Sequence, residues 1–364
     1  MGKKIRVGVL FGGKSAEHEV SLQSARNIID AIDKDKYEVV PIGIDKSGQW
    51  FLDEAERLLP EANTEGLIAR DEDARVTLMP EGRGKIVGQS APGGMGAVDV
   101  VFPVLHGPMG EDGTVQGLLR LADVPYVGPN VLGSAVAMDK DVMKRLLRDA
   151  GIPNAAWRTV HQFEASEVDL DGVIAELGLP LFVKPANLGS SVGISKAHDL
   201  SELGPALEEA FRYDNKVLIE AFVDGREIEI SVLGNEDPIA SLPGEVLPQH
   251  EFYSYEAKYL DEKGAVLQIP ADLPNEVVKR VQDLAVRTFQ VLCCEGMARA
   301  DFFLQADGAL MVNEINTIPG FTPISMYPKL WAASGISNTE LVDRLIQLAI
   351  DRYEREQQLK TSFF

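Results

Sequence analysis

Cysteine is scarce in this sequence, and long apolar runs are missing from it. The 364 residues include only two cysteines, the neighbours Cys293 and Cys294. Adjacent cysteines make a poor disulfide framework, and no CxxC spacing points to a metal site. We therefore expect a reduced, cytosolic setting. No stretch approaches the ~20 apolar residues of a membrane-spanning helix, and the run Val7–Phe11 is more typical of a buried strand than of a signal peptide.

Positive charge is also in short supply. The chain has 35 Lys and Arg against 56 Asp and Glu, which gives a formal net charge of −21. This balance argues against nucleic acid or an anionic membrane as the main partner, because both attract excess Lys and Arg. Small anionic ligands need only a local positive site, so the net charge does not exclude them.

Two common nucleotide-binding signatures are absent. No GxxxxGK[ST] motif occurs, and Gly12-Gly13-Lys14-Ser15 after the first predicted strand is not GxGxxG, so a nicotinamide cofactor has little support. A different phosphate-binding pattern is present. Lys184 ends a predicted strand and precedes the loop Gly189–Gly193, whose backbone N–H groups suit a phosphate. The alternative for this loop is an ordinary surface turn.

The order of apolar and polar stretches predicts an α/β chain of two or three domains. Strands are predicted over 5–11, 37–44, 98–105, 181–184, 217–222 and 227–233, and helices over 20–32, 114–121, 139–150, 200–213 and 275–291. We expect three domains, which consist of residues 1–129, 130–222 and 223–364. Residues 53–81 carry nine acids and three bases and are expected to form a solvated insertion. Residues 245–267 are expected to form a long lid loop.

The most informative local pattern lies between residues 297 and 317. Asp307-Gly308 predicts a two-residue hairpin turn. That turn places Asp301 opposite Glu314 and Arg299 opposite Asn316, with all four side chains on one face. The other face is expected to belong to the core, through Ala298, Ala300, Phe302, Leu304, Met311 and Ile315.

Two carboxylates that face each other across a sheet are unfavourable unless a cation lies near them. The oxygens of Asp301, Glu314 and Asn316 suit one or two Mg²⁺ ions, with phosphate oxygens completing the coordination. The alternative is a solvated polar face on which Arg299 neutralises Asp301. A one-residue shift in the turn would break the predicted pairing.

An ordered set of motifs resembles the D-alanine–D-alanine ligases of the ATP-grasp superfamily. Each segment is modest alone, but together they are specific and extend over nearly the whole chain. The matching segments are Phe11–Ser21, Leu105–Gly107 with Gly110–Gly113, Met138–Lys140, Val183–Pro185 with Gly189–Gly193, Glu256–Tyr259, Arg299–Asp301, Asn313–Asn316 and Pro319-Gly320.

The resemblance implies an ATP-grasp architecture, with an N-terminal doubly wound α/β domain and two further α+β domains enclosing the ATP site. It implies a cytoplasmic enzyme, expected as a homodimer, that makes D-alanyl-D-alanine for peptidoglycan through a D-alanyl phosphate. ATP would be the co-substrate and Mg²⁺ the metal, with Mn²⁺ as a substitute. The segment Glu256–Tyr259 favours D-alanine as the second substrate. The alternatives are a related ligase for D-lactate or D-serine, or a nucleotide-binding or redox module.

The resemblance also implies a role for particular residues. Catalysis would involve Glu17, Ser190, Tyr259, Arg299 and the Gly320 N–H group. Substrates would contact His106, Lys258, Ser325 and Met326. ATP would contact Lys140, Lys184, Ser191, Glu220, Ala221, Phe222, Val223, Glu227 and Asn313, and metal would bind Asp301, Glu314 and Asn316.

Within this set, Glu17 would hold the ammonium of the first D-alanine, and Ser190 and Tyr259 would form a hydrogen-bonded set with Glu17 that closes the site. Arg299 with Gly320 would stabilise the oxyanion. Ser325 would bind the carboxylate of the second D-alanine.

Three of these residues have ordinary alternatives. His106 also fits a packed histidine at a strand end, Glu220 a solvated acid at a strand end, and Lys140 a solvated helix lysine. Position 221 departs from those relatives that have lysine there. Backbone contacts would therefore replace a side-chain contact to adenine.

Overall fold

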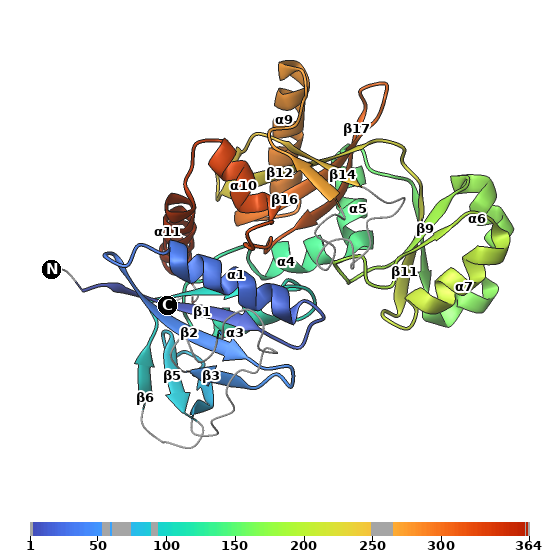
Figure 1. The fold of residues 1–364 in the computed structure, drawn as a ribbon. Coiled ribbons are helices and arrows are strands. Elements are labelled where there is room, and N and C mark those ends of the chain that lie inside the picture. The colour runs from blue at the N-terminus through green and yellow to red at the C-terminus, as the bar shows by residue number, and fades with distance from the viewer. Residues whose placement is uncertain are drawn as a thin grey trace.

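A computed structural model of the chain describes residues 3–52, 59, 74–88, 94–248, 265–360 and 362. Its strands form four sheets, which lie in three groups. We call them the N-terminal, central and C-terminal groups, after the place of their strands in the chain. Figure 1 shows the N-terminal group at the blue end of the chain. Helices and sheets alternate as the sequence predicts for an α/β protein. Among the helices of the described ranges, none combines the length and apolar character that crossing a bilayer requires.

The N-terminal sheet has the strand order β3-β2-β1-β7, and β1 runs parallel to both of its neighbours. Its strands are β1 (Ile5–Gly12), β2 (Tyr37–Ile44), β3 (Trp50–Leu52) and β7 (Val100–Val104). The apolar run of β1 is buried on both faces, as a covered parallel strand requires. Helices α1 (His18–Ala31) and α3 (Thr114–Leu121) follow the sheet's strands, and an antiparallel sheet of β4 (Val76–Leu78), β5 (Lys85–Gly88) and β6 (Gly94–Ala97) lies beside them (Figure 1).

The acidic stretch 53–81 is not solvated throughout. Val76 and Leu78 form β4 and are 2% and 3% exposed, and Leu59 packs into the core of the N-terminal sheet. The expectation of a solvated insertion is therefore wrong at these positions, because three apolar side chains anchor the stretch despite its acidic composition. The other residues between 53 and 73 lie outside the described ranges.

The C-terminal helix α11 (Asn338–Gln357) packs on the N-terminal sheet although it comes from the opposite end of the chain. Its Leu345 and Ile346 share a core cluster with β1 and β7. Arg352 anchors the helix further, since its guanidinium donates to the carbonyls of Gly128 (2.6 Å) and Tyr126 (2.7 Å).

The central sheet is antiparallel with the order β10-β9-β11-β8. It consists of β8 (Trp157–His161), β9 (Leu181–Pro185), β10 (Ser195–Ala197) and β11 (Lys216–Ala221). Helices α6 (Leu170–Leu177) and α7 (Leu200–Ala210) cover one face, at the right of Figure 1, and a short 3₁₀ helix spans Gln162–Glu167.

The C-terminal sheet has the order β15-β14-β12-β16-β17, and β13 pairs with β12. Its strands are β12 (Arg226–Gly234), β13 (Ile239–Ala240), β14 (Gly244–Pro248), β15 (Ala265–Gln268), β16 (Gly296–Leu304) and β17 (Leu310–Asn316). The associated helices are α4 (Val131–Met138), α5 (Lys140–Asp149), α9 (Asn275–Val291) and α10 (Met326–Ala333).

The predicted lid loop 245–267 is too long at both ends. Strands β14 and β15 occupy its two flanks and pair antiparallel, with Val246 opposite Leu267. Residues 249–264 lie outside the described ranges, so the lid remains a prediction for them.

The β16–β17 turn also differs from the predicted one. Gln305 N–H donates to the carbonyl of Ala309 (2.9 Å), so the loop consists of residues 306–308 rather than of Asp307-Gly308 alone. Gly308 has φ +84°, the left-handed conformation that three-residue hairpin loops use. The expectation of a two-residue turn is wrong.

A β-bulge nevertheless restores the predicted pairing further along the hairpin. Asn313 is an extra residue in β17, and beyond it Asp301 faces Glu314 and Arg299 faces Asn316. The bulge cancels the shift introduced by the longer turn. The predicted pairing of the polar residues is therefore confirmed.

Between the turn and the bulge, the shifted register changes which side chains reach the core. Met311 is half-buried, whereas Leu310 and Val312 are 6% and 0% exposed, so the expectation that Met311 belongs to the core is wrong. The remaining predicted core residues of the hairpin are confirmed: Ala298, Ala300, Phe302, Leu304 and Ile315.

Candidate active site

A row of three carboxylates crosses the C-terminal sheet. Glu229 on β12 faces Asp301 on β16, which faces Glu314 on β17. We call Glu229, Asp301 and Glu314 the acidic row. Arg299 compensates part of its charge: Nε and Nη2 donate to the two Asp301 oxygens (2.8 and 2.7 Å), and Nε lies 2.9 Å from Glu229 Oε2.

The acidic row and Arg299 together keep an excess of negative charge. Desolvation acts against the Arg299 cation, but Asp301 and Glu229 outweigh it and hold the Arg299 pKa well above its usual range. Asn316 Nδ2 donates to Asp301 Oδ2 (3.1 Å). Arg299 thus neutralises Asp301, as the alternative interpretation of this face predicts, yet the carboxylate and amide oxygens still form a hard donor set that fits a divalent cation.

The described residues contain no cluster of three or more His, Cys, Asp or Glu side chains spaced for a metal. A cation at Asp301, Glu314 and Asn316 would therefore rely on two carboxylates and one amide. Ligands from outside the protein would have to supply the remaining oxygens.

Glu17 meets the glycine-rich loop of the central sheet. The Ser190 hydroxyl donates to Glu17 Oε1, so the predicted association of these two residues is confirmed. Gly107 closes the other side, because a Cβ there would lie only 3.0 Å from Glu17 Oε2. Ser190 and Ser191 have φ +51° and +60°, strained values for non-glycine residues that cluster at functional sites.

Lys140 is held against the residues that directly precede the same loop. It is the first residue of α5 and is 8% exposed. Its N–H donates to Ala186 O (3.0 Å) and its Nζ to Leu188 O (2.5 Å). The solvated-lysine alternative is therefore wrong for Lys140.

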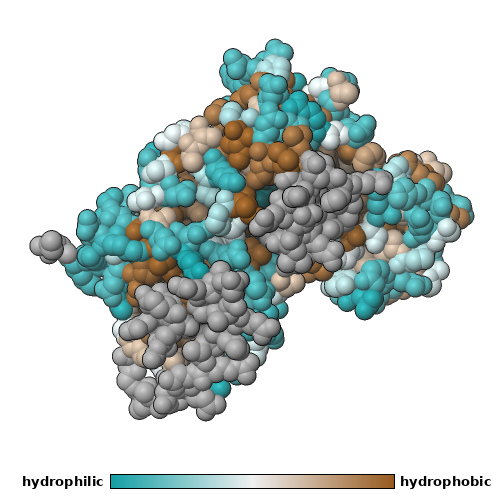
Figure 2. Space-filling view, viewed as in Figure 1, coloured by the Kyte–Doolittle hydropathy of each residue, from teal (hydrophilic) through white to brown (hydrophobic). Residues whose placement is uncertain are grey.

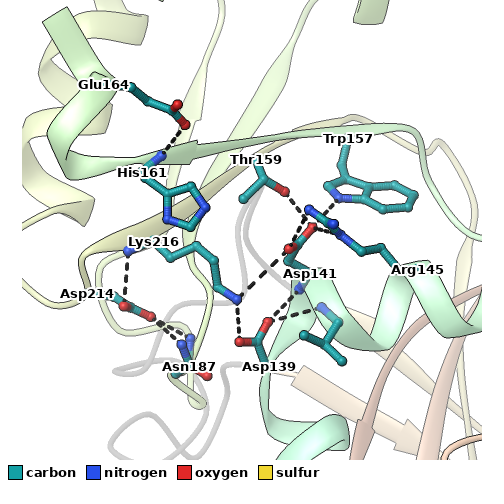
Figure 3. A network of polar contacts seen from close by, with 11 residues as sticks. Asp139, Asp141, Arg145, Trp157, Thr159, His161, Glu164, Asn187, Asp214 and Lys216 are labelled. Carbon is teal, nitrogen blue, oxygen red and sulfur yellow. Dashed lines mark hydrogen bonds and ion pairs between the residues drawn. The ribbon is translucent and has the colours of Figure 1, made fainter.

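A polar network fixes the start of α5 beside the loop (Figure 3). Asp139 caps the helix, since its Oδ1 accepts from the N–H groups of Asp141 and Val142 (both 3.1 Å). Lys216 on β11 donates to the other Asp139 oxygen. Asp214 then accepts from the N–H and the side chain of Asn187 (2.8 and 2.9 Å). Asp214 also accepts from the Lys216 N–H (3.1 Å), so the network links α5, β11 and the segment that directly precedes the glycine-rich loop.

Glu220 lies between two lysines. Its Oε1 is 2.7 Å from Lys184 Nζ, and its Oε2 is 2.8 Å from Lys144 Nζ. Burial opposes ionisation of Glu220, but the charges of Lys184 and Lys144 outweigh it and lower the Glu220 pKa to about 2. The alternative of a solvated acid is wrong, because Glu220 is only 3% exposed.

The two residues after Glu220 use their backbone N–H groups for hydrogen bonds within the protein. The N–H of Ala221 donates to Ala156 O (2.9 Å) and that of Phe222 to Pro180 O (3.3 Å). A backbone contact from Ala221 to adenine would therefore have to use its carbonyl. The Phe222 ring is 43% exposed and lies 4.9 Å from Lys196 Nζ.

His106 bridges the N-terminal sheet and the chain that follows β17. It is 4% exposed, its Nδ1 donates to Ile318 O (3.0 Å), and its Nε2 lies 3.5 Å from Ser24 Oγ. Burial lowers the His106 pKa. The packed-histidine alternative describes its burial correctly, and its carbonyl partner stands two residues before the predicted catalytic Gly320.

Gly320, Ser325 and Met326 come together at the start of α10. A Cβ on Gly320 would lie 2.8 Å from Ser325 Oγ, so these two predicted site residues are adjacent. The Met326 side chain is 4% exposed and belongs to an apolar cluster with Val246 and Leu330. A substrate carboxylate near Met326 would therefore meet the N-terminal N–H groups of α10 rather than this side chain.

The other predicted site residues have these positions. Glu227 lies half-buried on β12, Val223 follows β11, and Asn313 is the bulge residue of β17. Lys258 and Tyr259 lie outside the described ranges. Figure 2 shows hydrophobic surface gathered over the sheet and helices of the C-terminal group.

Sequence reasoning missed several polar residues of this region. Glu111 accepts from the N–H groups of Gly107 (2.7 Å) and Ile318 (3.1 Å), and desolvation together with the nearby Glu17 raises its pKa to about 8. The position of Glu111 within the motif-bearing stretch His106–Gly113 could have indicated that it lies in the site. Glu229 stands two residues after Glu227 and therefore shares its face of a predicted strand, and Lys144 stands one helical turn after Lys140. Side-chain periodicity could have identified both residues.

The fold and these charged groups together define the class of protein first. The chain is an α/β protein whose central antiparallel sheet carries Lys184 and whose C-terminal antiparallel sheet carries the acidic row, and this is the ATP-grasp fold of ligases. Solved structures agree in fold. That of the D-alanine-D-alanine ligase from Coxiella burnetii matches with a TM-score of 0.87 and 41% identity, over 98% of this chain and 97% of that one. A D-Ala:D-Ser ligase from Enterococcus faecalis matches with a TM-score of 0.84 and 36% identity, over 95% and 100%.

The family follows from the sequence comparisons. The models "D-ala D-ala ligase N-terminus" and "D-ala D-ala ligase C-terminus" match residues 6–129 and 146–347. A D-alanine–D-alanine ligase of Shouchella clausii is 56% identical over 100% of this chain and 99% of its own length. The ligase A of Escherichia coli K12 is 49% identical over 99% and 100%. The chain belongs to the D-alanine–D-alanine ligase family.

Proposed function

We propose that this chain joins two D-alanines to D-alanyl-D-alanine with cleavage of ATP to ADP and phosphate, for peptidoglycan precursors. Family membership over the full chain supports the reaction. The structural observation that carries the proposal is the convergence of distant segments on one place. Glu17 meets Ser190 of the central group, and Glu111 and His106 meet Ile318 of the C-terminal group.

In the first step, a carboxylate oxygen of the first D-alanine attacks the γ-phosphorus of ATP, and ADP leaves. Phosphoryl transfer depends mainly on positioning and on stabilisation of negative charge. Lys140 and Lys184 supply positive charge beside the glycine-rich loop. Glu17 holds the ammonium group of the substrate, and the Ser190 hydroxyl fixes the carboxylate of Glu17 by donating to it.

In the second step, the amine of the second D-alanine attacks the acyl phosphate carbonyl. The tetrahedral intermediate carries an oxyanion, which Arg299 and the Gly320 N–H stabilise. The intermediate then expels phosphate, and the attacking nitrogen loses a proton. Ser325, adjacent to Gly320, and the start of α10 bind the second carboxylate.

Asp301, Glu314 and Asn316 would hold the divalent metal, which we propose to be Mg²⁺ with Mn²⁺ as a substitute, in one or two ions. Such a cation neutralises charge on the phosphates during transfer. The excess negative charge of the acidic row supports this assignment. Lys258 and Tyr259 belong to the proposed site, as do the adenine-side residues Glu220–Val223 with Glu227, and the phosphate-side residues Ser191 and Asn313.

The second substrate needs its own test, because a D-Ala:D-Ser ligase shares this fold at 36% identity. We propose D-alanine on the segment Glu256–Tyr259. The experiment measures phosphate release from ATP with D-alanine alone, with L-alanine alone, and with D-alanine mixed with D-serine or D-lactate, and identifies each product by mass. We expect release with D-alanine and a D-alanyl-D-alanine product. Equal rates with L-alanine would refute the proposal, and a D-alanyl-D-serine or D-alanyl-D-lactate product in excess would change its second substrate.

We also propose a cytoplasmic homodimer, on family resemblance. Light scattering during gel filtration of the full chain tests the assembly. A mass of 39.7 kDa, that of one chain, would contradict the dimer.

A further inference from the structure

The two lysines that flank Glu220 differ in their surroundings. Lys144 is 1% exposed, donates to the carbonyl of Ala155 (3.2 Å), and has its Nζ 5.4 Å from the centre of the Trp157 ring. These contacts anchor it in the interior between α5 and the central sheet. Lys184 is 12% exposed and is the last residue but one of β9, near the glycine-rich loop, so it is the lysine that a ligand can reach.

The charges of this triad do not balance. One carboxylate and two ammonium groups leave one net positive charge in a nearly water-free place. Buried charges are expensive unless they are paired. An excess cation is tolerable where an anion is to be bound, and the accessible member of the triad is Lys184.

We propose that Lys144 is a positioning residue for nucleotide binding: it holds the Glu220 carboxylate permanently and thereby frees Lys184 to give its charge to the phosphates of ATP. This inference rests on the proposed function, which places Lys184 on those phosphates. Without Lys144, Lys184 would be the one buried counter-ion of Glu220 within the part of the chain that the structure describes, and its positive charge would be neutralised by Glu220.

The test measures equilibrium binding of a non-hydrolysable ATP analogue to the full-length protein. Lys144→Met should raise the dissociation constant about 10- to 100-fold, the factor that one charge-assisted hydrogen bond represents. The KM for D-alanine should stay within about twofold, because Glu17 and Ser190 are unchanged. Lys279→Met is the matched control, since Lys279 is exposed on α9 and should leave nucleotide binding unaltered.

Glu220→Gln separates positioning from a structural role. In that background the carboxylate of Glu220 no longer competes for Lys184, so adding Lys144→Met should change the dissociation constant by no more than about twofold. An equal loss in both backgrounds would overturn the inference, because Lys144 would then act independently of Glu220. If Lys144→Met alone does not fold, a loss of more than about twofold between Glu220→Gln and the double variant would still overturn the inference.

The failure of this inference is distinguishable from the failure of the proposed function. If Lys184→Met weakens nucleotide binding but Lys144→Met does not, Lys144 has no such role and the ATP site stands. If the unmodified protein does not bind the analogue at all, the proposed function fails and the inference fails with it.

Discussion

Replacing Arg299 by methionine should expose the repulsion within the acidic row. The substitution keeps an apolar stem but removes two hydrogen bonds to Asp301 and the contact with Glu229. The side chains of Arg299, Glu229 and Asp301 are only 13–20% exposed, so water compensates poorly for the loss of the guanidinium. Breaking a buried pair of this kind costs about 3–5 kcal/mol, and we expect about 3 kcal/mol here.

The assay is urea unfolding followed by tryptophan fluorescence, to which Trp50, Trp157 and Trp331 contribute; Trp331 is 2% exposed on α10 next to this sheet. Mg²⁺ should recover at least about 1 kcal/mol of the loss, since a bound cation replaces the missing positive charge and stabilises the folded state by mass action. The matched control is Arg344→Met. Its exposed pair with Glu340 on α11 should contribute only about 0.5 kcal/mol, with no dependence on Mg²⁺.

Two results would refute the reasoning. A loss below about 1 kcal/mol would mean that Glu229 and Asp301 do not depend on the guanidinium, and that surface screening is enough. If Mg²⁺ stabilises the Arg299→Met protein no more than the unmodified one, the acidic row does not gain a cation in place of Arg299. The metal assignment would then lose its electrostatic basis.

Three further predictions concern single side chains. Glu314→Gln should lower metal-dependent turnover at least about 100-fold while the unfolding midpoint stays within a few degrees, and retained turnover would contradict the metal assignment. The folded chain holds the Glu111 proton up to about pH 8 and the unfolded chain only to about 4.5, so stability should fall as pH rises between these values. Glu111→Gln should flatten that slope in pH-dependent melting, and an unchanged slope would assign it to other groups. Gly107→Ala should lower the free energy of unfolding by about 1–2 kcal/mol, because φ at this position is +74°. It should also raise the KM for D-alanine, because the added Cβ would press on Glu17. An unchanged KM would show that Gly107 does not shape the substrate site.

The sequence determined most elements and part of the site. The helix predicted over 275–291 has the bounds of α9, and the strand predicted over 37–44 has those of β2, because apolar periodicity is a local property. The polar face of the hairpin was also predictable, since side chains alternate along strands. Even there the agreement of Asp301 with Glu314 depended on a turn and a bulge that offset each other, and neither was predicted.

Only the tertiary structure decided which distant groups meet. Nothing in the local pattern joins Lys144 to Glu220, or brings α11 from the end of the chain into the core of the N-terminal sheet. Glu111 likewise has its raised pKa because folding places it beside Glu17 and away from water. Local periodicity specifies how a segment buries its own apolar face. Charge pairing and desolvation depend on neighbours that are remote in sequence, and they exist only once the segments have packed.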